Sequence, residues 1–87
     1  MLTLEEAIKP ILDKEAPGYE PVAAREGKYH WFVYFGFNGE IAPGDVPYVI
    51  DKETGELGFF PIPYVIRQEK PSPIELEMGE GKEVPIS

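Results

Sequence analysis

Nine consecutive residues, 29–37, are almost all aromatic or β-branched, and this run constrains the fold more than any other feature of the 87-residue chain. Its composition strongly favours a β-strand. Both faces of such a strand would be apolar, because successive side chains point to opposite sides. We therefore expect the strand at the middle of a sheet, with a helix over one face and a second cover over the other.

The first 16 residues predict the covering helix. Thr3 and Glu6 have the spacing of a capping box, in which each side chain bonds the other residue's backbone N–H. Pro10 predicts a kink rather than a second helix, and Pro17-Gly18 ends the element. One apolar stripe at helical spacing comprises Leu4, Ala7, Ile8, Ile11 and Leu12.

Three further segments predict strands. Glu20–Arg25 contains Pro21, which suits an edge strand or a strand start. Tyr48–Ile50 and Leu57–Phe60 flank a turn in which Gly55 is expected to adopt the left-handed conformation of a bulged hairpin. The sequence therefore predicts an α+β fold, with the N-terminal helix packed on a three- to four-stranded antiparallel sheet.

The C-terminal part of the chain has a different composition. Residues 1–69 are expected to form a single α+β domain, and residues 70–87 an acidic tail containing Pro and Gly. We expect this Pro-rich acidic segment to be extended, because its apolar residues are sparse. The alternative is a late edge strand in which Ile74, Leu76 and Met78 alternate.

Net charge and missing residue types exclude several classes of function. The chain has 16 acidic and 8 basic side chains, a formal charge of −8, so nucleic-acid binding is disfavoured. It has no cysteine, which excludes disulfides and thiolate metal sites. Its apolar runs are far shorter than the ~20 residues of a membrane span, and no secretory leader is recognisable. We therefore expect a cytoplasmic protein that binds neither nucleic acid nor membranes.

Catalytic templates fit the sequence poorly. His30 is the only imidazole, and within the most apolar strand a structural role is favoured over a general base. Ser72 and Ser87 both lie in the expected tail, away from His30, so a serine triad is not predicted. The acidic residues of segment 51–56 do not have the spacing of a calcium loop. We expect no enzyme activity, no metal and no cofactor; a cleft with two carboxyls of strongly perturbed pKa would favour the enzyme alternative.

Aromatic residues are unusually frequent, with one Trp, five Tyr and five Phe. One helix stripe cannot cover them all. They either fill a small core that has few Leu and Ile, or reach the surface as anchors for a partner. Together with the acidic charge, which would steer a basic partner, the pattern favours a protein-binding module.

Four segments in order resemble the immunity protein 35 family. They are the helix start at Leu2–Ala7, the aromatic strand Trp31–Phe35, the step Gly44-Asp45, and the hairpin Pro47–Leu57. The resemblance covers residues 2–60. It implies a small bacterial protein that neutralises a toxin of a polymorphic toxin system by direct binding, without catalysis.

The expected partner is thus a protein, a toxin under this resemblance. A self-associating homodimer or a chaperone-like domain is the alternative function. The predicted partner-binding residues are Trp31, Tyr34, Glu40, Asp45, Tyr48, Asp51 and Glu53.

Overall fold

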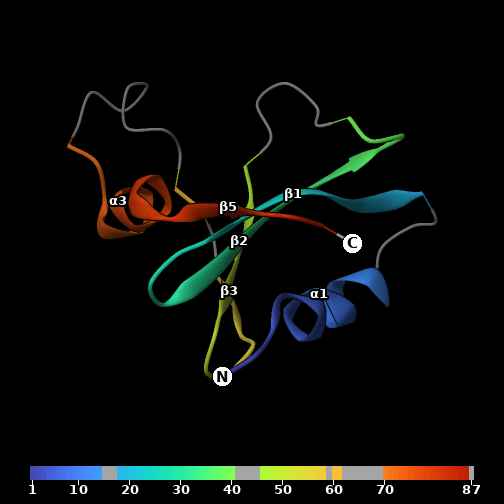
Figure 1. The fold of residues 1–87 in the computed structure, drawn as a ribbon, viewed down its shortest axis with the longest axis horizontal. Coiled ribbons are helices and arrows are strands. Elements are labelled where there is room, and N and C mark those ends of the chain that lie inside the picture. The colour runs from blue at the N-terminus through green and yellow to red at the C-terminus, as the bar shows by residue number, and fades with distance from the viewer. Residues whose placement is uncertain (15–17, 41–45, 59, 62–69, 87) are drawn as a thin grey trace.

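The computed structural model describes residues 1–14, 18–40, 46–58, 60–61 and 70–86. Within these residues, five antiparallel strands form one sheet in the order β4-β3-β2-β1-β5, and helices α1 and α3 lie apart from each other beside it (Figure 1). The α+β prediction is confirmed, with more strands than expected. The elements are α1 (Leu4–Leu12), β1 (Tyr19–Glu26), β2 (His30–Phe37), β3 (Tyr48–Asp51), β4 (Leu57–Gly58), α3 (Pro73–Glu80) and β5 (Lys82–Val84).

Strand β2 is the central strand of the sheet, as its composition predicts. Trp31, Val33 and Phe35 alternate along one face and pack in a core with helix α1. Phe32 points to the opposite face and is fully buried, with the Phe60 ring edge-on at a centroid distance of 6.4 Å. Both faces of β2 are therefore covered.

Helix α1 begins as the sequence predicts. Thr3 Oγ1 accepts a hydrogen bond from the N–H of Glu6 at 3.3 Å, and Glu6 Oε1 accepts from the N–H of Thr3 at 3.0 Å. Pro10 lies inside the helix, which ends at Leu12, earlier than expected. The predicted stop at Pro17 lies outside the described residues. From the stripe, Ala7, Ile8 and Ile11 are buried, whereas Leu12 is exposed.

A buried lysine ties the N-terminus to the sheet. The Lys52 side chain is 7% exposed, and its Nζ lies 2.7 Å from Glu26 Oε2 and 4.9 Å from the centroid of the Trp31 ring. Trp31 Nε1 donates to the carbonyl of Leu2 at 3.0 Å, and the Leu2 N–H donates to the carbonyl of Lys52 at 2.7 Å. The start of the chain is therefore fixed to β2 and to the residue after β3.

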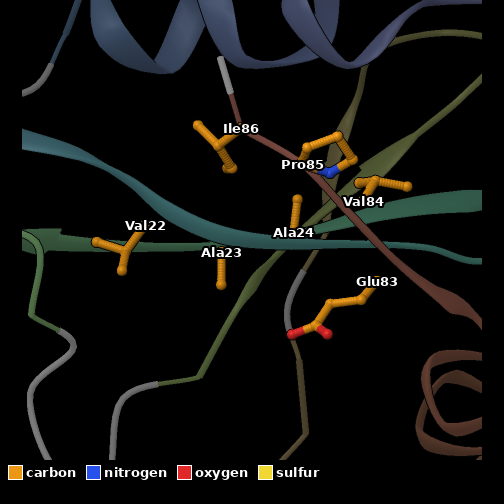
Figure 2. Close-up of a pocket in the computed structure, with 7 residues that line it drawn as sticks. All are labelled: Val22, Ala23, Ala24, Glu83, Val84, Pro85 and Ile86. Carbon is orange, nitrogen blue, oxygen red and sulfur yellow. The ribbon is translucent and has the colours of Figure 1, made fainter.

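Strand β1 is irregular in its first half. Its pairing with β2 shifts between Pro21 and Ala23, which leaves Val22 as a bulge. Strand β5 pairs only with residues 24–26 of β1. Figure 2 shows residues 83–86 crossing over β1, with Ile86 between β1 and α1 in this view. Residues of β1 and of this segment line a hollow of about 320 Å³. The half of β1 that contains Pro21 therefore does not pair with β5.

The prediction of an extended C-terminal segment is wrong. Ile74, Leu76 and Met78 lie in helix α3 rather than alternating along a strand. Ser72 and Glu75 form a second capping box, with hydrogen bonds of 3.3 and 3.0 Å, and Pro73 occupies the first turn. These are helix-start signals that outweigh the proline content of the segment. The late edge strand exists, but at 82–84, and it brings the C-terminal segment into the sheet.

Candidate functional site

The first residues of β1 and β3, together with β4, line an apolar hollow of about 420 Å³. We call it the aromatic hollow. Three of its side chains are aromatic, and the remaining wall is aliphatic. Its lining consists of Tyr19, Val46, Pro47, Tyr48, Leu57, Gly58 and Phe60.

The tyrosines of the aromatic hollow are held in place by a buried phenylalanine. Tyr19 stacks on Phe35 with ring centroids 5.3 Å apart, and Tyr48 meets the same ring edge-on at 5.2 Å. Phe35 itself is buried in the core beside α1. The strand pairing that places β1, β2 and β3 side by side therefore also orients both tyrosine rings.

Exposed apolar side chains surround this hollow. Phe37 is 52% exposed and lies 5.0 Å from Tyr19 between ring centroids, while Leu57 and Val46 are 46% and 45% exposed. Large apolar side chains that gather around a hollow, rather than being scattered singly, are typical of interaction surfaces. Helix α1 packs on β1 and β2 and contributes no residue to the lining.

The three aromatic residues predicted to bind a partner occupy different places. Trp31 is 8% exposed and belongs to the core. Tyr34 is half-buried and points to the opposite face of β2 from Trp31. Tyr48 alone among the three lines the aromatic hollow. The core and surface explanations for the aromatics thus each hold for part of the set.

The four predicted acidic residues do not gather at one site either. Glu40 is exposed and forms an isolated bridge with Phe37 after β2. Glu53 is exposed in the turn after β3, and Asp45 lies outside the described residues. Asp51 serves that turn, because its Oδ1 accepts hydrogen bonds from the N–H groups of Glu53 at 2.7 Å and Thr54 at 3.1 Å. Gly55 completes the turn with a φ of 76°, as predicted.

The hydrogen bonds of Asp51 in this turn are expected to depend on pH. Hydrogen bonds from the backbone of Thr54 and then Glu53 lower the pKa of the Asp51 carboxyl. A carboxyl whose pKa is lowered by folding stabilises the fold at pH values above its pKa in the unfolded chain, which is about 3.9. This contribution is lost as the pH falls through the folded-state pKa. We expect the amide proton shifts of Glu53 and Thr54 to titrate below pH 4 in NMR spectra. In an Asp51→Asn variant this titration should be absent, and its persistence would assign it to another group.

Tyr19, Phe37 and Leu57 were missed as site residues by reasoning from the sequence. A usable signal was the turn near Gly27-Lys28, since a tight hairpin there pairs Glu26 with Trp31 and, further out, Tyr19 with Phe37. Counting outward from the turn would have placed both rings at the same end of the sheet. The bulge at Val22 shifts the pairing of β1 with β2 by one residue, and no sequence pattern predicts this bulge.

Chemical groups suited to catalysis are sparse in the described part of the chain. It contains no group of three or more His, Cys, Asp or Glu residues placed to hold a metal ion. The pKa values of the Glu6 and Asp51 carboxyls are lowered, in each case chiefly by backbone hydrogen bonds in a cap or turn. No described helix has the length and apolarity needed to span a bilayer.

Comparisons of the whole chain with protein-family models, curated proteins and solved structures find no match. The resemblance to the immunity protein 35 family therefore stays a prediction. The aromatic hollow, with its exposed apolar neighbours, is the feature that best suits binding of a partner.

Proposed function

We propose that this chain is a non-catalytic protein-binding module, of the immunity type, that neutralises a cognate toxin by direct binding. The aromatic hollow carries this proposal. It combines two oriented tyrosine rings with exposed apolar neighbours on a chain of net charge −8.

The hollow suits a protein partner because its rings are already positioned. Binding energy at protein interfaces concentrates in a few buried aromatic and apolar anchors. Tyr19 and Tyr48 are oriented by Phe35 before any partner arrives, so little side-chain entropy is lost on binding. A side chain of the partner would fill the hollow between Tyr48 and Leu57.

Charge indicates the chemistry of the partner. Two exposed glutamates are next in sequence to residues that line the hollow. Glu20 follows Tyr19, and Glu56 precedes Leu57. A net charge of −8 repels a second copy of the same chain and attracts a basic surface. We therefore expect a basic protein, whose association rate falls as salt is added.

Leu57→Arg tests the hollow directly. The arginine would fill the apolar hollow and place a positive charge there, which repels a basic partner, and we expect affinity for the partner to fall about 30-fold, or ~2 kcal/mol. Leu76→Arg is the matched control, because Leu76 is the same residue type, is 52% exposed and lies on α3. Affinity is measured by calorimetry against the protein encoded beside this chain, and protection by survival of cells that express both.

Two outcomes would contradict the proposal. Equal losses of affinity in Leu57→Arg and Leu76→Arg would remove the aromatic hollow from the interface. Failure of the unchanged chain to protect cells from the neighbouring toxin, or to bind it, would overturn the immunity function.

A further inference from the structure

The carboxylate of Glu77, on helix α3, lies in a cradle formed by the turn between β1 and β2. Its Oε2 accepts hydrogen bonds from the N–H groups of Tyr29 and His30, each at 2.8 Å. Its Oε1 lies 2.9 Å from His30 Nδ1. The Glu77 side chain is only 11% exposed, so these three contacts replace its water.

The cradle is shaped for a carboxylate by the turn itself. An ionised carboxylate has only acceptors, so His30 Nδ1 must carry the hydrogen in this contact. Gly27 makes room for it, because a Cβ at that position would collide with Glu77 Oε2 and with the Phe32 ring. Two adjacent backbone N–H groups directed at one oxygen form the kind of concavity that binds anions.

Helix α3 depends on such polar contacts for its attachment. It has no buried residue. The Arg25 guanidinium of β1 also contacts the end of the helix, because it donates to the carbonyls of Met78 in α3 at 3.0 Å and of Gly81, the residue after α3, at 2.7 Å. Strand β5, which follows, pairs with β1 over three residues. The carboxylate of Glu77 and the Arg25 guanidinium therefore together hold the helix against the sheet.

We infer that the β1–β2 turn is a carboxylate-binding site and that Glu77 is its internal ligand. The site recognises the carboxylate of an acidic protein side chain through Tyr29 N–H, His30 N–H and His30 Nδ1. When Glu77 is withdrawn, the site accepts another carboxylate of the same chemistry. This property is independent of the partner proposed for the aromatic hollow.

Chemical rescue tests the site in the full chain. Glu77→Ala removes the internal ligand, and we expect the melting temperature to fall by about 10 °C. Sodium acetate at about three times its dissociation constant should then raise it by about 5 °C relative to sodium chloride of equal ionic strength. In NMR spectra, acetate should also return the amide protons of Tyr29 and His30 toward their positions in the unchanged chain.

The controls separate this site from general salt effects. The unchanged chain, whose site is filled, should show no difference between acetate and chloride. Glu80→Ala removes an exposed carboxylate from the same helix and should leave the melting temperature within about 2 °C. Acetate that acts no differently from chloride on Glu77→Ala, or that moves no amide of the turn, would overturn the inference.

A milder variant keeps the inference testable if Glu77→Ala does not fold. Glu77→Asp keeps the charge but shortens the side chain by one methylene, which withdraws the carboxylate from the turn. We expect the amide protons of Tyr29 and His30 to move upfield and the melting temperature to fall. A Glu77→Asp variant indistinguishable from the unchanged chain would contradict a site of this geometry.

Discussion

Replacing Trp31 with alanine is expected to lower the free energy of unfolding by about 4 kcal/mol. The ring is 8% exposed and packs in the core with α1. Its loss also leaves the Leu2 carbonyl without the Nε1 donor and removes the aromatic face beneath the buried Lys52 ammonium. A domain of this size has a total stability of roughly 5–10 kcal/mol, so chemical denaturation should show a large shift of the midpoint.

Trp31→Phe is the matched control. It keeps an aromatic ring in the core but lacks the N–H that donates to Leu2, so we expect a loss of only about 1–2 kcal/mol. The pair of variants also separates the two roles considered for this residue. A Trp31→Ala chain that unfolds like the unchanged one but no longer binds its partner would make Trp31 a surface anchor.

Gly27→Ala is expected to cost about 3 kcal/mol, because it combines overpacking with the loss of the Glu77 contact. The added Cβ would lie 2.6 Å from Phe32 Cε2, and Phe32 is fully buried and cannot move aside freely. It would also meet the Glu77 carboxylate. Relative to the unchanged chain, the variant should show a larger increase in the hydrogen-exchange rate in α3 and β5 than in β2 and β3.

Gly79→Ala provides the comparison for this effect. Gly79 lies in α3, and a Cβ there would meet nothing within 4 Å. Alanine should therefore stabilise the helix by about 0.5–1 kcal/mol. If Gly27→Ala and Gly79→Ala behave alike, the close packing of the turn against α3 is not a determinant of stability.

Much of the fold could be predicted from short stretches of sequence, because the residues that form each sequence pattern also make the contacts that fix that element. The double-sided apolar run of β2 had to be central, and the Thr3 capping box and Gly55 turn require only their nearest neighbours. Helix α3 was missed although Ser72 and Glu75 carried the same capping signal as α1. Its sparse apolar content was the misleading feature, because polar contacts from Arg25 and Glu77 also attach it to the sheet.

The candidate site was harder to predict because it depends on contacts between distant segments. Tyr48 was identified, but its neighbours Tyr19 and Leu57 come from β1 and β4, which the pairing of four strands brings together. The acidic residues are predicted from their charge and from the loop and hairpin positions that they occupy in the sequence. Asp51 instead uses its carboxylate within its own turn, a role that charge does not reveal.

The irregular first half of β1 has a consequence for how molecules of this protein meet one another. A regular strand that no neighbour covers offers a ladder of backbone groups on which another chain can grow an aggregate. Here Pro21 lacks an N–H and Val22 bulges, so the stretch beyond β5 is a poor template for sheet growth. The outer strands are equally unsuitable, since β4 has two residues and β5 exposes Lys82 and Glu83. The described edges of the sheet that carries the apolar hollow are therefore poor templates for fibril growth.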